Sequence, residues 1–340
     1  WQGLSTNSQP INQIRIVDGD VVRGASPLTA HFDQRAIGLN TARPLYPEME
    51  KQPFGVIVEN RFLRHTLINR LSTQKNIHLF ENTRIEKKNE DERAVQITLG
   101  NGVVLSAPLL VVAEGKGSQA AKEISDFSET HYQQTALVMT VKAERDHQGV
   151  AVEHFYPHGP FAMLPMTDGR VNVVWTETPT MANKLLALPA DDLYHQLVVR
   201  FGDWLGKIEI IGQVFSYPLA ARHARHYSRG RLLLLADAAH SIHPIAGQGF
   251  NLGLKDIIAL TNILTRTKNQ GGDSGGRAVM EQYQQARWQD NQNMLRATDA
   301  LNRLFSTDRD WLTALRRLGL FGFDQLRFIK QRTVNHAMGL

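Results

Sequence analysis

The segment from residue 231 to 255, RLLLLADAAHSIHPIAGQGFNLGLK, constrains the fold more than any other part of the chain. Its run of leucines is typical of a strand buried on both faces of a parallel sheet. The strand leads to Asp237, then to a loop with Pro244, and then to a helix that opens on GQG at 247–249. The glycines allow close approach of the backbone, and the N–H groups of a helix N-terminus favour an anionic ligand. An isolated GxG is more often a plain strand-loop-helix connection, but here the aspartate, the proline and the glycines occur together.

This segment resembles the second flavin-binding motif of the group A flavoprotein monooxygenases, which share the p-hydroxybenzoate hydroxylase fold. Within that group it is most similar to the ubiquinone-biosynthesis hydroxylases, typically GDAAHxxHPxAGQGxNLGxxD, and among them to the 2-octaprenyl-6-methoxyphenol hydroxylases. The resemblance implies that Asp237 holds the ribityl chain of FAD and that Pro244 lies beside the isoalloxazine ring. Ala236 stands where the family has glycine, and we expect only a small local shift from the extra methyl group. The cofactor-binding residues predicted in this way are Asp237, Pro244, Gly247, Gln248, Gly249, Phe250, Asn251, Asn60 and Arg64.

Two further segments match the family less specifically. LLVVAEGKGS at 109–118 is an apolar strand that ends where relatives have DG and a serine, with Glu114 in place of the aspartate. A strand-ending turn is the alternative, and without a GxSxG elbow Ser118 is no nucleophile.

The other segment, VIVENRFLRHTLINRL at 56–71, predicts a strand and then a helix capped by Asn60. Leucines at fourfold spacing, Leu63, Leu67 and Leu71, predict its buried face. In relatives the residue at the position of Asn60 contacts the ribose or phosphate region of the cofactor, and Arg64 is a neighbour. A simple helix cap and a solvated arginine are the alternatives.

The two ends of the chain differ in how they match the family. FIKQRTVNHAMGL, residues 328–340, resembles the usual ending of the ubiquinone hydroxylases. The chain begins at Trp1, and no strand in it is followed by GxGxxG and an acidic residue, the fingerprint that opens the family. We therefore expect a fragment of a longer gene product that lacks the first βαβ unit and the residues for the ADP half of FAD. An unusual natural truncation is the alternative.

The fold class expected is α/β, with a Rossmann-like FAD/NAD(P)-binding domain, an inserted antiparallel-sheet substrate domain and C-terminal helices. The cofactor domain would comprise residues 1–130 and 221–270, and it includes a hairpin signal at Asn101-Gly102. The strand-rich stretch 131–220 resembles the substrate sheet of these hydroxylases, with a helical interruption at 185–201. Residues 271–340 would form a helical region that includes a long polar helix at about 278–305.

Composition agrees with a large enzyme that is not a membrane-spanning protein. The 340 residues are 42% hydrophobic, without an apolar run long enough to cross a bilayer and without a secretory signal. The absence of cysteine excludes disulfides, thiolate catalysis and cysteine metal sites, and it is compatible with a reducing cytoplasm.

The net charge of +5 and the pI near 9.4 raise the question of an acidic partner. The basic residues are dispersed and no nucleic-acid-reading module is present, so we expect no nucleic-acid partner. The segment 309–332 mixes basic and aromatic residues, which favours either a packed C-terminal helix pair or peripheral contact with an anionic membrane surface. We expect a cytoplasmic protein with peripheral contact at the inner membrane, and the sequence leaves the oligomeric state open.

The substrate wall is predicted from HFYPHGPFAMLPM at 154–166, which resembles the GPxAxLP segment that faces the flavin in this family. An apolar wall suits a prenylated phenol and keeps water from the reactive oxygen intermediate, with an ordinary sheet core as the alternative. The substrate-binding residues predicted are His158, Phe161, Met163 and Pro165. No metal is expected, because the histidine pairs His154/His158 and His223/His226 lack a third ligand in the sequence.

The resemblance implies that NAD(P)H reduces FAD, that oxygen adds at flavin C4a and that the hydroperoxide transfers oxygen to a phenol ring. Pro244 and His243 are predicted to act at the reacting centre; for a general base, His240, His243 and His158 are candidates by position only. The predicted function is hydroxylation of a polyprenylated phenol in ubiquinone biosynthesis. The alternatives are a hydroxylase of a soluble aromatic compound and a non-enzymatic lipid-binding or assembly subunit of the ubiquinone biosynthetic complex.

Overall fold

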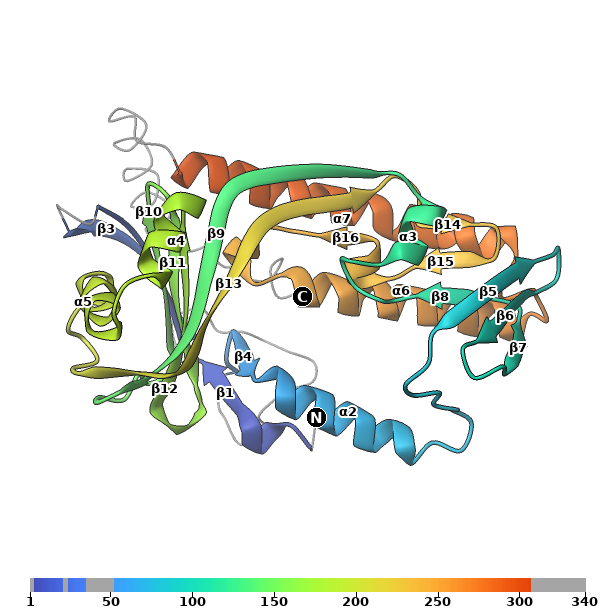
Figure 1. Ribbon diagram of the computed structural model, residues 1–340, viewed down its shortest axis with the longest axis horizontal. Helices are drawn as coiled ribbons and strands as arrows, with labels where there is room; N and C mark the ends of the chain where they lie inside the picture. The colour runs from blue at the N-terminus through green and yellow to red at the C-terminus, as the bar shows by residue number, and fades with distance from the viewer. Residues whose placement is uncertain (1–2, 21–23, 35–51, 307–340) are drawn as a thin grey trace. The chain divides into compact units, whose positions relative to one another are not determined.

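The computed structural model describes residues 3–20, 24–34 and 52–306 of the chain (Figure 1). Contacts between residues divide the chain into two compact units. Unit 1 comprises Trp1–Ile77, Gln133–Pro218 and Arg303–Leu340, and unit 2 comprises His78–Tyr132 and Leu219–Asn302. The predicted C-terminal motif at 328–340 and the amphipathic segment at 309–332 lie outside the described residues.

Unit 1 is built on a mixed sheet whose strand order is β16-β13-β9-β12-β11-β10-β2-β3, with the short β16 pairing with the part of β13 that belongs to unit 2. Its elements are η1 (Ser5–Asn7), β1 (Ser8–Ile11), β2 (Gln13–Asp20), β3 (Gly24–Asp33), β4 (Gly55–Val58), α2 (Asn60–Ser72), β10 (Val150–Tyr156), β11 (Gly159–Met166), η2 (Thr167–Gly169), β12 (Arg170–Glu177), α4 (Pro179–Leu186) and α5 (Ala190–Phe201). The long strands β9 (Phe127–Ala143) and β13 (Ile208–Ala224) contribute residues to both units.

The predicted antiparallel sheet is present, and it also contains β2 and β3, which the sequence did not assign to it. β10, β11, β12 and β9 pair antiparallel in this order. β2 then adds to β10 in parallel, and β3 adds antiparallel to β2. Residues 13–20 and 24–33 therefore join the sheet of unit 1, whereas the sequence assigns 1–130 to the cofactor domain. A strand's own side-chain pattern shows that it is half-buried but not which sheet edge it pairs with.

The main core of unit 1 lies between one face of this sheet and the helices α4 and α5 (Figure 1). Leu185 of α4 and Leu197 of α5 pack there with Trp175 and Phe161 from the strands. The single helical interruption expected at 185–201 is two helices. Pro189 separates them, because a proline disfavours helical backbone in the residue before it.

Helix α2 differs from its prediction. Glu59, not Asn60, precedes the first turn as the N-cap residue, and the helix buries none of its residues. Leu67, predicted on a buried face, is 53% exposed. Leucines four residues apart form an apolar stripe along a helix, but the elements packed against the helix decide whether that stripe is covered.

Unit 2 combines two three-stranded sheets with helices. Its elements are β5 (Ile85–Glu90), β6 (Val95–Leu99), β7 (Val104–Ala107), β8 (Leu110–Val112), α3 (Gln119–Ile124), β14 (Ser228–Arg229), β15 (Leu232–Leu234), η3 (Ala236–Ala238), β16 (His240–Ser241), η4 (Pro244–Ala246), α6 (Gly249–Asn269) and α7 (Arg277–Phe305), the last residues of which belong to unit 1. The hairpin predicted at Asn101-Gly102 joins β6 and β7, and the long helix predicted at 278–305 is α7.

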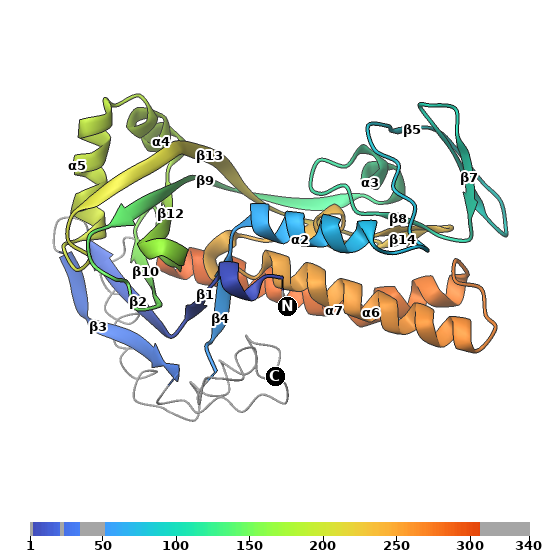
Figure 2. The same ribbon diagram turned by 90° about the horizontal axis from the view of Figure 1, so that it is seen from below.

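The leucine strand lies in the core of unit 2, as predicted. Leu233 and Leu234 of β15 are fully buried, and the strand pairs in parallel with β8. Side chains of α6 and α7, among them Leu260 and Tyr283, pack in the same cluster. The two helices run side by side (Figure 2). This core anchors both the strand and the helix between which the GQG loop is held.

Candidate functional site

The loop between β15 and α6 has the strand-loop-helix form that the sequence predicts. Gly247 closes η4 in the left-handed region, at φ +61°, which explains why a glycine stands there. The first main-chain bond of α6 runs from Leu252 N–H to the carbonyl of Gln248 at 3.0 Å. The preceding N–H groups, of Gly249 to Asn251, have no acceptor within the helix. They can therefore donate to a ligand.

The loop has an exposed side and a buried side. The exposed residues are Asp237, Pro244, Gly247, Phe250 and Asn251, and the buried ones are Ala238, Ala239, His240, His243 and Ile245. The amide of Asn251 donates to Gln248 Oε1 at 3.0 Å and orders the first turn of α6. All but two of the cofactor-binding residues predicted by resemblance lie in this loop, and most have exposed side chains.

His243 belongs to the buried side and supports the turn at Pro244. Its Nδ1 accepts from the N–H of Ile245 at 3.2 Å, and its ring packs edge-on against Tyr132 with centroids 4.8 Å apart. Burial lowers the pKa of His243 to about 4. The ring is therefore neutral at physiological pH and a weak base, because an effective general base has a pKa near the working pH. Its predicted catalytic role stays a prediction; the geometry gives it a positioning role in the loop.

The buried side rests on the carboxylate of Asp256, about two turns into α6. Asp256 is fully buried and accepts hydrogen bonds from His240 Nε2 at 2.6 Å and from Arg287 Nε at 2.7 Å. The backbone N–H of Ala236 donates to it at 3.3 Å. Burial alone would raise the pKa of Asp256, but the hydrogen bonds from His240 and Arg287 bring it below its usual value. One charged group thus joins both ends of the loop to α7.

A chain of polar side chains extends from this carboxylate. Asn291 donates to Asp256 Oδ1 at 3.2 Å and to the hydroxyl of Tyr227 at 3.0 Å. The Tyr227 hydroxyl lies 2.7 Å from His223 Nε2, and His223 Nδ1 lies 2.9 Å from Gln292 Oε1. Since Asn291 occupies the hydroxyl as a donor, the tyrosine donates to His223, whose other nitrogen then donates to Gln292. His223 is therefore part of a hydrogen-bond chain.

A family model described as an FAD binding domain matches residues 46–298. The chain belongs to this FAD-binding family. It is 41% identical over 341 aligned positions to the ubiquinone hydroxylase UbiL of Rhodospirillum rubrum, covering all of this chain and 75% of that protein. It is 29% identical to the 3-demethoxyubiquinol 3-hydroxylase of Escherichia coli, covering 86% of this chain and 75% of that protein.

The solved structures show the fold. The p-nitrophenol 4-monooxygenase PnpA of Pseudomonas putida superposes with a TM-score of 0.77 at 16% identity, covering 99% of this chain and 83% of that one. Klebsiella pneumoniae HpxO, solved with FAD and uric acid, superposes with a TM-score of 0.68 at 15% identity, covering 99% and 82% of the two chains. The predicted resemblance to FAD-dependent aromatic monooxygenases is confirmed.

The residues of the loop fit FAD. Family members bind this cofactor, and here the exposed Asp237 carboxylate can accept hydrogen bonds from hydroxyl groups. The N–H groups at the start of α6 suit an electron-rich ring edge. No side chain crowds the backbone at Gly247, where the space that a Cβ would occupy has no atom within 4 Å. A ligand can therefore lie against this turn.

The predicted residues outside the loop have other surroundings. Asn60 and Arg64 are exposed on α2 in unit 1. Ser118 caps α3 by accepting from Ala121 N–H at 3.0 Å, and its hydroxyl donates to Glu114 at 2.6 Å. The alternative for residues 109–118, a turn that ends a strand, agrees with their local structure, because β8 ends at Val112 and Ser118 caps α3.

The predicted substrate wall divides between the two faces of the sheet. Phe161, Met163 and Pro165 are buried, and the first two belong to the core under α4 and α5. Residues Ala162 and Leu164, which alternate with them, point to the opposite face and are partly exposed. His158 is exposed in the turn before β11. The role of this strand in substrate binding stays a prediction, and the structure shows which of its faces is covered by helices.

The sequence did not single out three residues that the structure makes central. Asp256 ends the family motif and was assigned no role, while Arg287 and Asn291 lie in an otherwise polar helix. Glu59 is another case: it accepts from Arg170 Nη2 at 2.7 Å and ties the start of α2 to the end of η2. Burial raises its pKa, but the bonds from Arg170 and Arg61 lower it to a net value below the usual one. For Asp256, the sequence did offer a signal, because it is an acidic residue at the end of a largely apolar motif.

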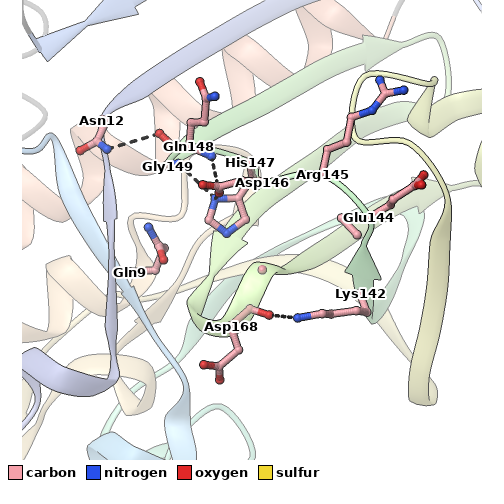
Figure 3. A pocket seen from close by; sticks show the side chains of 12 residues that line it. Gln9, Asn12, Lys142, Glu144, Arg145, Asp146, His147, Gln148, Gly149 and Asp168 are labelled. Atoms are coloured by element: carbon pink, nitrogen blue, oxygen red, sulfur yellow. Dashed lines mark hydrogen bonds and ion pairs between the residues drawn. The ribbon is translucent and has the colours of Figure 1, made fainter.

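A separate polar cleft lies in unit 1 (Figure 3). His147 Nε2 donates to the carbonyl of Met166 at 2.8 Å, so its Nδ1 accepts from Gly149 N–H at 3.1 Å. Lys142 donates to the carbonyl of Asp168, and Asn12 donates to that of Gln148. The cleft is lined by groups that bond one another, and none of the predicted site residues lines it. Among the residues that the structure describes, no cluster of three or more metal-ligating acidic, histidine or cysteine side chains occurs.

Ala236 carries local backbone strain that glycine would relieve. Its φ is +53°, in the left-handed region, where an L-residue with a side chain is disfavoured by about 1–2 kcal/mol. A Cβ at Gly253 would lie 3.0 Å from the Ala236 Cβ, so the contact with α6 is also close. The departure from the family glycine thus has a conformational cost, in addition to the small shift expected from sequence.

We expect Ala236→Gly to raise the free energy of unfolding by about 0.5–1 kcal/mol, the strain relieved minus the added freedom of the unfolded chain. Urea unfolding followed by tryptophan fluorescence measures this. Ala238→Gly is the matched control; it removes a buried methyl group in the same turn and is expected to destabilise. Equal destabilisation by both variants would contradict the assignment of strain to Ala236.

We expect Asp256→Asn to lower the free energy of unfolding by about 3–5 kcal/mol, because Arg287 loses its buried carboxylate partner. Asp290→Asn is the control, since Asp290 pairs with the same arginine at 2.6 Å but its side chain is 45% exposed, and exposed pairs contribute about 0–1 kcal/mol. Both are measured by urea unfolding. Similar effects of the two substitutions would show that the buried carboxylate is not the principal partner.

Proposed function

We propose that the protein is an FAD-dependent monooxygenase that hydroxylates the aromatic ring of a polyprenylated phenol in ubiquinone biosynthesis, with NAD(P)H as electron donor. The observation that carries the proposal is the segment 236–256, which contains the family motif and is fixed by hydrogen bonds to the buried Asp256 carboxylate. Identity of 41% along the whole chain to a ubiquinone hydroxylase supports the substrate class. The E. coli relative named for demethoxyubiquinol supports it as well.

FAD, when bound, supplies the electron transfer and the oxygen chemistry, and the chain supplies binding, orientation and exclusion of water. In the proposal, Asp237 binds the ribityl hydroxyls and the N–H groups of 249–251 bind the pyrimidine edge. Pro244 lies against the ring, and Gln248 and Asn251 order the turn that presents these groups. Asn60 and Arg64 are proposed contacts to the rest of the cofactor; they are exposed and so available for it.

The substrate is proposed to lie against the face of the unit 1 sheet that α4 and α5 leave free. Ala162 and Leu164 on β11 are the proposed apolar contacts, in place of Phe161 and Met163, whose side chains are buried in the core. An apolar wall suits a prenyl chain and excludes water from the reacting ring. His158, exposed at the start of β11, remains a proposed contact at the edge of this wall.

Contact with the membrane and with other proteins of the pathway follows from the substrate. No helix in the described part of the chain is both long enough and apolar enough to cross a bilayer. We propose that the protein reaches its lipid-soluble substrate by peripheral contact with the inner membrane and works within a ubiquinone biosynthetic complex. Pull-down of tagged protein from membranes, with and without salt, tests both points.

The first experiment is the absorbance spectrum of the protein purified from its complete gene. We expect a bound-flavin spectrum. Asp237→Ala should raise the dissociation constant for FAD at least tenfold while leaving apoprotein stability within about 0.5 kcal/mol, because its side chain is exposed. Asp126→Ala, another exposed acid of unit 2, is the control. Well-folded protein without flavin would favour the non-enzymatic alternative.

Substrate class is tested with purified holoenzyme, NADPH or NADH, and a short-chain prenylated phenol presented in detergent. We expect a product heavier by one oxygen atom, whose ring position is read by NMR. 4-Nitrophenol and 4-hydroxybenzoate serve as soluble comparison substrates. Hydroxylation of the soluble phenols at higher kcat/KM than the prenylated one would favour the alternative of a soluble aromatic substrate.

A further inference from the structure

One carboxyl group on the free face of the unit 1 sheet has no role so far. Val150 and Val152 of β10 point into the core beneath α4 and α5. Because side chains alternate along a strand, Glu153 points to the opposite face, with Phe155. This is the face proposed above to hold the substrate.

The strand register places Glu153 in an otherwise apolar row. Paired residues share a face, and the row across β3, β2, β10, β11, β12 and β9 is Ala30, Ile16, Glu153, Ala162, Val174 and Val138. Glu153 is its single ionisable member. In the neighbouring row, Asp18 of β2 pairs with Phe155, whose ring stacks on Phe305 of α7 at 3.8 Å. Asp18 is the ionisable group nearest to Glu153 along these rows.

The carboxyl of Glu153 lies in largely buried, apolar surroundings. Burial raises the pKa of its carboxyl to about 8. Part of its surface is nevertheless accessible, and no hydrogen bond or ion pair holds the carboxyl among the described residues. Keeping an ionisable group in such a position is unfavourable for folding, and groups of this kind concentrate at functional sites.

We propose that Glu153 accepts the proton of the phenol hydroxyl of the substrate. The inference rests on the proposed function and deepens it by assigning the missing base. In the step, the phenol O–H bond breaks, a new O–H bond forms on the Glu153 carboxylate, and the electron pair remains on the phenolate oxygen. The phenolate makes the ring a better nucleophile toward the oxygen that the cofactor delivers. When the ring becomes aromatic again, the C–H bond at the newly hydroxylated carbon breaks and releases its proton to water, and the protonated Glu153 returns its own proton to the phenolate oxygen.

Glu153 fits this task better than the histidines considered from the sequence. His243 is buried beneath the Pro244 turn and has a pKa of about 4. His240 is tied to Asp256 at 2.6 Å. Glu153 of β10, in contrast, pairs with Ala162 of β11, the strand proposed to contact the substrate. Among the described residues its carboxyl has no hydrogen-bond partner that a substrate would have to displace.

The test uses holoenzyme from the complete gene, with Glu153→Gln as the variant. Glutamine keeps the size of the side chain and removes the base, so we expect kcat to fall about 10²- to 10⁴-fold with KM within a few fold and unchanged flavin content. In the wild type, activity should rise with pH through about 8, as the carboxyl ionises. Glu153→Asp should keep part of that rise, whereas Glu153→Gln should lose it. Glu209→Gln, an exposed acid of β13, is the control.

A second measurement does not depend on activity. Since the folded-state pKa lies above the usual value, the unfolded chain loses this proton first, and stability is lost as pH rises from about 4.5 to about 8. The free energy of unfolding of Glu153→Gln, measured in urea and taken relative to that of the wild type, should therefore be higher at pH 9 than at pH 5. An equal difference at both pH values overturns the buried, unpaired state on which the inference depends.

The outcomes separate the two proposals. Wild-type holoenzyme that hydroxylates no prenylated phenol overturns the proposed function and this inference with it. Active wild-type enzyme whose pH profile is the same in the Gln variant overturns the inference alone. The inference is supported if Glu153→Gln loses the rise in activity near pH 8 and Glu153→Asp keeps part of it. The control Glu209→Gln should keep the whole rise.

Discussion

The structure of the candidate site depends on one buried charge. The carboxylate of Asp256 receives hydrogen bonds from the loop, through His240 and the backbone of Ala236, and from α7, through Arg287 and Asn291. A buried carboxylate is stable only when its oxygens are paired, and here each oxygen has at least two donors. Because the donors come from different elements, the same group that satisfies the charge also fixes where the loop begins and how α6 packs on α7.

This support explains why the motif has both buried and exposed side chains. Side chains that face the core, such as His240, His243 and Ile245, are held by hydrogen bonds and packing. Those that face outward, such as Asp237 and Pro244, remain exposed and available to a cofactor. A loop whose exposed groups must keep fixed positions needs such a buried counterpart, since unsupported loops lose precision in the geometry of a site.

The sheet of unit 1 shows the same principle on a larger scale. One face is closed by α4 and α5 and contains Trp175 and Phe161. The other carries the apolar row interrupted by Glu153. Because side chains alternate along β11, Phe161 and Met163 pack in the core, while Ala162 and Leu164 point to the opposite face and are partly exposed.

The sequence by itself determined the leucine strand, the GQG turn, the long helix α7 and the family, because each depends on local pattern or on a contiguous motif. It could not determine that β2 joins the substrate sheet, that α2 leaves Leu67 exposed, or which face of β11 is free. Nor could it show that Asp256 meets Arg287, 31 residues away, or that Ala236 adopts a positive φ. These features are set by pairing and packing between distant segments, and a residue's own sequence context does not specify its partners.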